Sequence, residues 1–290
     1  MSLTDDVRAA CREIAANARF VAIDVERLEA LDPGPPPELD AERHYLEGSP
    51  EDVADYMLVL DTVNFGSGWF PALRKRPGMS GYFTVASSLT DFWRASGGWS
   101  TSELRALRSE DVASVLGQEP DHELMALYAE ALRDLGRFLD GRRALDLVAE
   151  AAGSAERLAE LLAAGMPFFD DTGFWKRAQI APNDLALAGV AEFHDLARLT
   201  IFADNLVPHV LRVDGVLRYD PNLAARIDAG ELLPPGGHER EIRGCAVHAC
   251  ELLSGRLGVP ARSIDVALWH RGQSPEYKAI PRHRTRTVYY

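Results

Sequence analysis

The chain has 290 residues, of which 47% are hydrophobic, so it is long enough to bury a substantial core, and disorder is not expected. Its 31 lysines and arginines against 44 aspartates and glutamates give a formal charge of −13, which opposes sequence-independent binding to nucleic acid or to an anionic membrane. Three cysteines are too few for a disulfide framework, and no segment resembles a secretion signal or a membrane span, so we expect a cytoplasmic protein with a small ligand.

Helical periodicity dominates from the start of the chain. Apolar residues recur at spacings of three and four from Val7 to Ala18, and Thr4 precedes them as the expected helix cap. The proline-rich segment 32–37 interrupts this pattern and predicts a connector, because prolines fix φ and remove backbone donors. Ser49 followed by Pro50 is typical of the start of a helix, which we expect to continue to Val63.

Further helices are expected where a capping residue precedes an apolar pattern or where a glycine ends one. They begin after Ser100, which opens a capping box with Glu103, after Ser109 with a stop at Gly117, at Leu124 with an end before Gly141, after Ser154 with a stop at Gly165, at Asp220-Pro221, and before Ile242. The chain therefore repeats helix, stop and helix over most of its length.

Signals for strands are few. They occur at residues 82–85, at residues 211–219 around the turn Asp214-Gly215, and at residues 285–290. No signature recurs at the period of a helical solenoid. We therefore predict a single all-α domain over residues 1–290, with at most a small accessory sheet.

Several common functional motifs are missing. Gly66-Ser-Gly68 lacks the third glycine of a dinucleotide site and the Lys-Ser/Thr of a phosphate loop, and no Gly-x-Ser-x-Gly elbow occurs. Cys245, His248 and Cys250 have the only spacing that resembles a metal site, but three such positions on one helix cannot face the same ion. We expect no metal and no cofactor, and we expect Cys245 to be a buried thiol rather than a nucleophile.

Three aspartates lie inside otherwise apolar segments. They are Asp61, Asp204 and Asp265. Burying a charge is costly unless the charge is paired or used, so each of them alone has an ordinary explanation as a cap or an ion pair at the edge of the core. Together, the three favour a polar cleft.

Two basic clusters complete the set of candidate features. Lys176 and Arg177 are adjacent cations that could bind a phosphate or could neutralise Asp170 and Asp171 at the surface. The second cluster, residues 282–286, is most simply a solvated tail, although the tyrosines that follow it suggest that this segment docks onto the body of the protein.

Several short motifs, in the right order over most of the chain, resemble those of the queuosine-salvage family. They are Leu60–Phe65 with the following Gly-Ser-Gly-Trp, Lys176–Ile180, Phe202–Asp204 with Val207-Pro208, Glu241–Cys245, Leu268-Trp269 and the pair Tyr289-Tyr290. Members of this family release queuine from queuosine 5′-phosphate. The resemblance therefore implies an all-helical fold similar to that of the helical DNA glycosylases, and hydrolysis of a ribosyl N-glycosidic bond.

The resemblance also implies roles for particular residues. Asp204 falls on the family's active-site aspartate, and Asp265 falls on a second carboxylate that contacts the ligand. His44 and Phe202 resemble pocket positions around the base.

Other positions match the family without an implied role, or depart from it. Asp61 and Glu241 match motif positions to which we assign no role beyond substrate binding. Asn205-Leu206 stands where relatives usually have Tyr-Arg, and the segment after Asp265 reads Val-Ala-Leu-Trp-His instead of Tyr-Tyr-Leu-Trp-Asp. We therefore expect His270 to take part in substrate binding and the selectivity for the phosphate, ribose or cyclopentenediol group to depend on these positions.

Cleavage of a glycosidic bond passes through an oxocarbenium-like state, which an ionised Asp204 would stabilise or capture covalently. Queuine is a 7-deazaguanine and lacks N7, so help for the leaving group must come from a donor at O6 or N3. We expect Asp265 to pair with the secondary amine of queuine, and Lys176 and Arg177 to bind the 5′-phosphate. Two alternatives stay open: a non-catalytic queuine- or nucleoside-binding protein, and a nucleic-acid glycosylase of similar fold, which the charge of −13 disfavours.

Overall fold

The computed structural model describes residues 2–290 and is built almost entirely from helices. In chain order they are α1 (Leu3–Ala16), α2 (Val25–Ala30), α3 (Pro50–Thr62), α4 (Gly81–Ser96), α5 (Thr101–Ala106), α6 (Ser109–Leu116), α7 (Glu123–Leu139), α8 (Ala144–Glu150), α9 (Ala155–Gly165), α10 (Lys176–Leu187), α11 (Leu206–Val213), α12 (Pro221–Asp228), α13 (His238–Leu257), α14 (Ala261–Arg271) and α15 (Pro275–Lys278). Short 3-10 helices cover Phe70–Ala72, Pro167–Phe169 and Leu196–Arg198. The strands β1 (Val21–Ile23) and β2 (Leu217–Tyr219) form an antiparallel two-stranded sheet in which Ala22 lies opposite Arg218.

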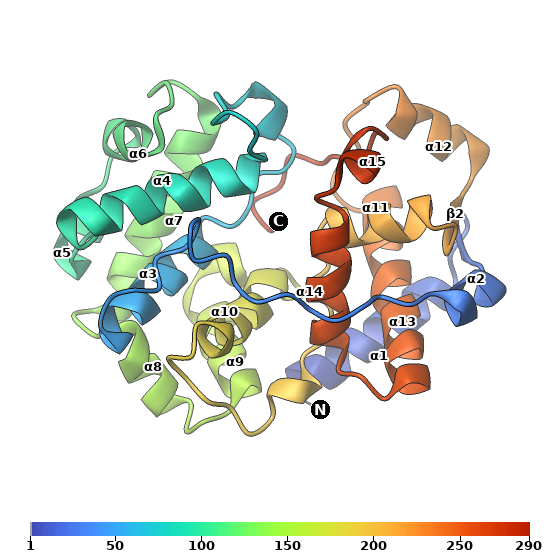
Figure 1. Cartoon of the computed structure of the whole chain (residues 1–290), viewed down its shortest axis with the longest axis horizontal. Helices are drawn as coiled ribbons and strands as arrows, with labels where there is room; N and C mark the ends of the chain where they lie inside the picture. Colours follow the sequence, from blue (N-terminus) through green and yellow to red (C-terminus); the bar gives the residue numbers. More distant parts are fainter. Residues whose placement is uncertain (1) are drawn as a thin grey trace.

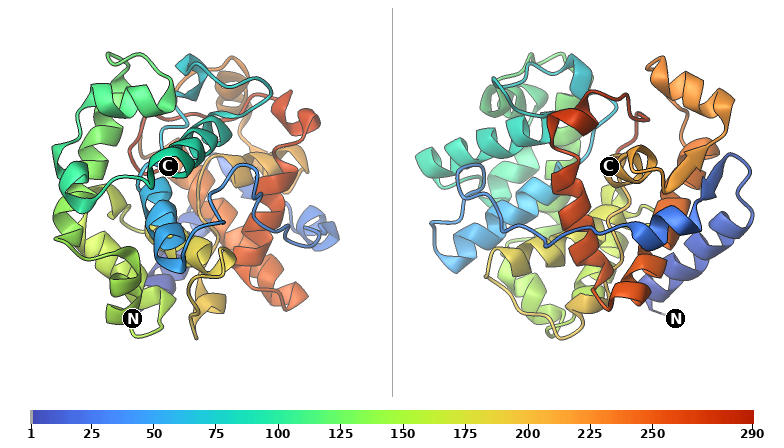
Figure 2. Two further views of the ribbon diagram at one scale, coloured as in Figure 1. Left: turned by 60° about the vertical axis from the view of Figure 1, so that its left-hand side comes forward. Right: turned by 45° about the vertical axis from the view of Figure 1, so that its right-hand side comes forward.

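The helices form two groups (Figure 1). Helices α3 to α9 lie on one side, and α1, α11, α13 and α14 lie on the other side, where α13 packs against α1, α11 and α14. Helix α10 lies between the groups and packs against α3 and α9, while the connector between α2 and α3 crosses the face of the molecule in two views (Figure 2). The prediction of a mainly helical chain with at most a small sheet is confirmed.

Local capping signals placed most helix starts correctly. Ser49, Ser100, Ser154 and Asp220 each accept a hydrogen bond from a backbone N–H of the first turn of the helix that follows. Two other caps were predicted wrongly. Ser2 rather than Thr4 caps α1, because Thr4 lies inside the helix and donates its hydroxyl to Glu156. The cap of α6 is Arg108, whose N–H donates to Asp111, and Ser109 is the first helical residue.

Of the three predicted strands, only part of one is present. Residues 82–85 lie in α4, where the aromatic and β-branched side chains mostly face the core. Within residues 211–219, only the last three form a strand, because α11 continues to Val213 before the turn. Residues 285–290 form no strand; they pack against the body of the protein with Thr285 and Tyr290 buried, and a bridge joins Leu232 to Arg284 just before them.

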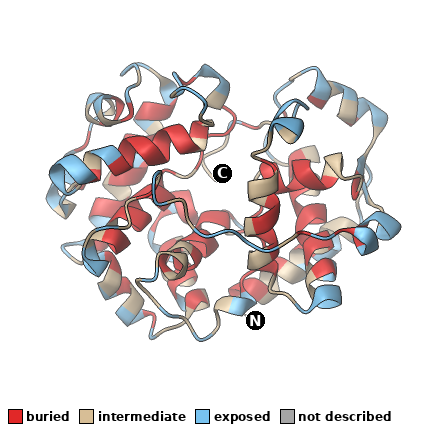
Figure 3. Cartoon of the chain, viewed as in Figure 1, coloured by how far each residue is buried: buried red, intermediate tan, exposed pale blue. Residues whose placement is uncertain are grey.

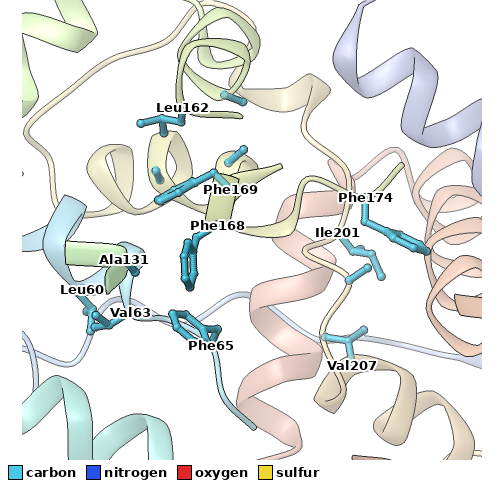
Figure 4. Close-up of a cluster of buried hydrophobic side chains, with 14 of the residues drawn as sticks. Leu60, Val63, Phe65, Ala131, Leu162, Phe168, Phe169, Phe174, Ile201 and Val207 are labelled. Atoms are coloured by element: carbon cyan, nitrogen blue, oxygen red, sulfur yellow. The ribbon is translucent and has the colours of Figure 1, made fainter. Parts of the chain in front are cut away.

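One large apolar core holds both helix groups together, and the buried helix faces turn inward (Figure 3). Its residues come from nearly every part of the chain, from Leu3 to Leu268. In its centre, Phe65, Phe168 and Phe169 lie close to one another beside Leu60 and Val63 (Figure 4). Within residues 2–290, no helix is both long and apolar enough to cross a membrane.

Close contact between α1 and α13 gives a test of this packing. A Cβ added to Gly244 would lie 2.6 Å from Cγ2 of Ile14, whereas a Cβ added to Gly255 on the same helix would meet nothing within 4 Å. Gly244→Ala should lower the free energy of unfolding by roughly 1–3 kcal/mol through overpacking. Gly255→Ala should raise it by roughly 0.5–1 kcal/mol, because alanine is the better helix former. Chemical denaturation measures both, and equal effects of the two substitutions would contradict the packing described.

Candidate active site

The candidate active site is a cavity between the two helix groups. Six of the predicted site residues line it: His44, Lys176, Phe202, Asp204, Asp265 and His270. They come from the connector before α3, the start of α10, the loop before α11, and α14. The cavity is open on one side and is lined by aromatic and apolar side chains with a few polar ones among them, as sites for small organic molecules usually are. Asp61, Arg177 and Glu241 lie outside its lining.

Asp204 lies at the N-terminus of α11. Its Oδ1 accepts the backbone N–H groups of Leu206 at 2.7 Å and Val207 at 3.1 Å. Unpaired amides at the first turn of a helix stabilise a negative charge. Because both bonds are made to Oδ1, the second oxygen is left for a ligand in the cavity.

The segment that carries Asp204 is held from two sides. The N–H of Phe202 donates to Oδ1 of Asp265 at 2.8 Å, and Nε of Arg243 donates to the carbonyl of Ala203 at 2.8 Å. Arg243 is buried, pairs with Asp171 and with Glu239, and its guanidinium lies over the rings of two aromatic residues, Phe174 and Tyr290. These contacts fix the carboxylate of Asp204 relative to α13 and α14.

Asp265 and Lys176 set the charge at the centre of the cavity. Burial, followed by the nearby Asp204 carboxylate, raises the pKa of Asp265 well above its usual range. Burial also lowers the pKa of Lys176 to about 8, against the opposing effect of Asp204. Lys176 therefore stays mainly cationic at neutral pH, and its Nζ donates to the carbonyl of Asn64 at 2.9 Å.

Arg177 points away from the cavity into the core. Its guanidinium donates to the carbonyls of Thr62, Phe168 and Val288, and it lies over the rings of Phe65 and Phe169. The side chain joins α3, the segment before α10 and the last residues of the chain. This placement does not support the phosphate contact predicted for Arg177.

Glu241 also has a structural position. Its Oε1 accepts the N–H groups of Arg19 at 2.9 Å and Val21 at 2.7 Å, which ties the start of β1 to α13. It does not reach the cavity, so the structure gives no support to the predicted contact between Glu241 and the substrate.

Asp61 lies behind the wall of the cavity, beside a residue that we did not predict. It is completely buried, and neither of its carboxyl oxygens receives a hydrogen bond from a donor group within residues 2–290. Asp184, within hydrogen-bonding reach of Asp61, lines the cavity and accepts a bond from the amide of Asn183 at 3.0 Å. Its position eight residues after Lys176, on the same face of α10, was the available signal.

Aromatic and histidine side chains form one end of the cavity. Nε2 of His44 lies 3.0 Å from the hydroxyl of Tyr82, whose ring packs edge-on against Trp269 at 5.2 Å between centroids. Burial lowers the pKa of His44, so its ring is neutral near pH 7. Nδ1 of His270 lies 3.1 Å from the carbonyl of Val266, which turns the other ring nitrogen of His270 away from the helix backbone.

A second cavity adjoins the first and shares part of its lining, including Arg282. We name it the basic chamber, because its cations are Lys75, Lys278, Arg282 and Arg284. Among these, Arg284 donates to the carbonyl of Gly230, whereas Lys75, Lys278 and Arg282 form no ion pair with any described residue. The segment 282–286 is therefore docked, as one of its two interpretations required.

The cysteines and the side chains that could bind a metal ion are the remaining candidate groups. Burial raises the pKa of Cys11 and of Cys245 to about 12, so neither is a thiolate at neutral pH. In the part of the chain that the structure describes, no three histidine, cysteine, aspartate or glutamate side chains are placed to hold a metal ion.

Comparison with known proteins agrees with this geometry. A model of the family described as "Queuosine salvage protein" matches residues 44–290. The chain belongs to the queuosine salvage protein family. The resemblance inferred from the short motifs is thereby confirmed.

Individual members of the queuosine salvage family match along most of the chain. A protein of Sphaerobacter thermophilus is 35% identical over 289 residues, covering 88% of this chain and 86% of its own length. A protein of Dictyostelium discoideum is 30% identical and covers 82% of this chain and 78% of its own length. One of Bos taurus is 29% identical and covers 98% of both chains. All three are named queuosine 5′-phosphate N-glycosylase/hydrolase.

The position of Arg177 gives a prediction that distinguishes a structural role of this side chain from a role in substrate binding. Arg177→Met should lower the free energy of unfolding by at least about 3 kcal/mol, because three buried carbonyls lose a charged donor and each unsatisfied group costs roughly 1–3 kcal/mol. Arg157→Met, at an exposed arginine, should have little effect. Urea denaturation measures both. A stable Arg177→Met variant that discriminates less between phosphorylated and unphosphorylated substrate would restore the original prediction.

Proposed function

We propose that this chain hydrolyses the N-glycosidic bond of queuosine 5′-phosphate and releases queuine. The observation that carries the proposal is the position of the Asp204 carboxylate. It is held at a helix N-terminus, and one of its oxygens is left for a ligand in the cavity. The names of its relatives support the same reaction.

Asp204 would act on the ribosyl side of the bond. As the bond breaks, positive charge develops on C1′ and the ring oxygen of the ribose, and a fixed carboxylate beside them lowers the energy of that state. The bonds from Leu206 and Val207 hold the carboxylate in place before the reaction, so little reorganisation is needed. A water molecule then completes the hydrolysis at C1′.

The aromatic end of the cavity would receive the base. Phe202, Trp269 and Tyr82 offer apolar surfaces for a flat heterocycle, and His44 and His270 offer ring nitrogens near its polar edge. We retain the proposal that Asp265 pairs with the secondary amine of queuine, because a cationic ligand group would stabilise the ionised form of a carboxyl whose pKa burial raises.

The basic chamber would receive the 5′-phosphate. Arg282 lines both cavities, and Asp204 lines the first of them with it. A ribose held at Asp204 would thus direct its 5′ substituent toward Arg282. Of the two phosphate contacts that we predicted, only Lys176 reaches the cavity.

The cations of the chamber belong to a chain whose formal charge is −13. A local positive site in an acidic protein suits a small anion better than the extended backbone of a nucleic acid. We therefore propose a small-molecule substrate, no nucleic-acid partner and a cytoplasmic location, which also suits three unpaired cysteines. Release of free base on incubation with queuosine 5′-phosphate separates this proposal from a binding protein that does not cleave its ligand.

Removing the charge of Asp204 tests the reaction. Asp204→Asn should lower kcat for queuosine 5′-phosphate by at least roughly 100-fold, because loss of one preorganised electrostatic contact costs about that much. Queuine should still bind, since the amide keeps the shape of the side chain. Chromatographic assay of released queuine and calorimetric titration measure the two effects. Turnover by Asp204→Asn near the parent rate would refute the role of Asp204.

Arg282 tests the placement of the phosphate. Arg282→Met should lower the preference for queuosine 5′-phosphate over queuosine, measured as the ratio of kcat/KM values, by roughly 10- to 100-fold, which corresponds to one charge-assisted hydrogen bond. Arg286→Met is the matched control, because Arg286 lies four residues later, is exposed and lines neither cavity. An unchanged ratio in Arg282→Met would remove the basic chamber from the phosphate site.

A further inference from the structure

Asp61 and Asp184 form a carboxyl pair that the mechanism above does not use. Asp61, on α3, is 0% exposed, and Asp184, on α10, lines the cavity beside it. Neither oxygen of Asp61 makes a hydrogen bond to a donor within residues 2–290, and its close polar neighbours are the carboxyl of Asp184 and the side-chain amide of Asn64. Two carboxyls can hydrogen-bond to each other only if one of them carries a proton.

Such a pair is costly to the fold unless it has a use. A buried carboxyl without a donor destabilises the folded state, and an amide or apolar residue would fill the same space at lower cost. Lys176 is the cation nearest to the pair, and it is shared with Asp204 and Asp265. Groups that combine burial with unmet hydrogen bonds are concentrated at functional sites.

The surroundings of the pair favour retention of one proton. Burial raises the pKa of Asp61 well above its usual range, and it raises the pKa of Asp184 to about 6. The other groups that act on the pair are Lys176 and Arg177 on α10, the amide of Asn64, Tyr82 on α4 and Asp265 on α14. The pair therefore retains a carboxyl proton to higher pH than an exposed aspartate does.

The reaction needs such a proton. The departing base carries away the electron pair of the C1′–N9 bond, and a 7-deazaguanine cannot accept a proton at N7. Asp204 is assigned above to the ribose side of the bond, so the proton must come from another group. The acid must therefore lie at the part of the cavity wall that faces the base.

We propose that Asp184 is the general acid of this hydrolysis and that Asp61 is the positioning residue that holds its proton. As the C1′–N9 bond breaks, its electron pair moves to the base, and Asp184 passes the shared proton to N3 or O6. Water attacks C1′ and loses a proton, which returns through Asp204 and solvent to the carboxyl pair. The hydroxyl of water ends on the ribose and its proton on queuine. The inference rests on the function proposed above.

Two substrates with different leaving groups test whether Asp184 is the general acid. Queuosine 5′-phosphate requires protonation of its base, whereas the 5-phosphate of 4-nitrophenyl β-ribofuranoside has a leaving group that departs as an anion. Asp184→Asn should lower kcat for queuosine 5′-phosphate by roughly 100- to 10,000-fold, the range of general acid catalysis, with little change for the nitrophenyl compound. Asp204→Asn should lose activity on both substrates, because both develop charge on the ribose.

Asp61→Asn separates a positioning role from a structural one. The amide can still bond to Asp184 but has no proton to share, so kcat for queuosine 5′-phosphate should fall with little change in KM. Because folding raises the pKa of both acids, their stabilising contribution is present below pH 3.8 and is lost as the pH rises, through about 6 for Asp184. The melting temperature of Asp61→Asn should therefore equal or exceed that of the parent at pH 7. Asp55→Asn, on the partly exposed side of α3, is the matched control and should leave kcat unchanged.

Each other result contradicts the inference. Equal losses on both substrates in Asp184→Asn, a rise in KM alone, or parent rates would exclude Asp184 as the acid. A lower melting temperature with unchanged kcat in Asp61→Asn would make Asp61 purely structural. If the parent chain releases no queuine, the proposed function fails together with this inference; if the parent releases it and Asp184→Asn does so equally well, only this inference fails.

Discussion

The buried guanidinium of Arg243 is the interaction on which the site depends. It joins α13 to Asp171 in the loop before α10, to the carbonyl beside Asp204, and to the ring of Tyr290. A buried arginine is tolerated only when its charge is paired and its donors are hydrogen-bonded. Here two carboxylates pair with the charge, and a carbonyl accepts a hydrogen bond. The same contacts that satisfy the charge therefore set the position of the segment that carries Asp204, so that the fold and the candidate site share one network.

The charged groups in and around the cavity have different surroundings. Asp204 accepts backbone hydrogen bonds at a helix N-terminus, burial raises the pKa of Asp61 and of Asp184, and four cations line the basic chamber. One side-chain type can thus serve opposite chemical needs when its surroundings differ. Lys176, between these regions, limits the repulsion among the carboxyls.

Local signals in the sequence predicted most of the helices, because a cap such as Ser49 or Ser100 acts within one turn of chain. They failed at residues 82–85, where side chains suited to a strand are buried equally well on a helix face, and tertiary packing decides between the two. Strand β1 was missed because three residues are too few to show an alternation.

For the site, the motif series placed Asp204 and Asp265 in the cavity but could not separate substrate contacts from structural ones. Arg177 and Glu241 lie in similar motifs, yet both hold backbone groups, and only the neighbours brought by folding show this. Asp184 and Arg282 were missed for the converse reason: one follows an ordinary proline-containing stretch of α10, and the other lies in a segment whose docking is a long-range contact.

The docking of residues 282–290 has a consequence for the stability of the cavities. Members of this segment line both cavities, the carbonyl of Tyr290 accepts the N–H of Gly66, and a Cβ added to Gly68 would lie 2.4 Å from the carbonyl oxygen of Thr285. A change that displaces this segment would therefore remove part of the wall of both cavities at once. The two cavities thus depend on the same few backbone contacts.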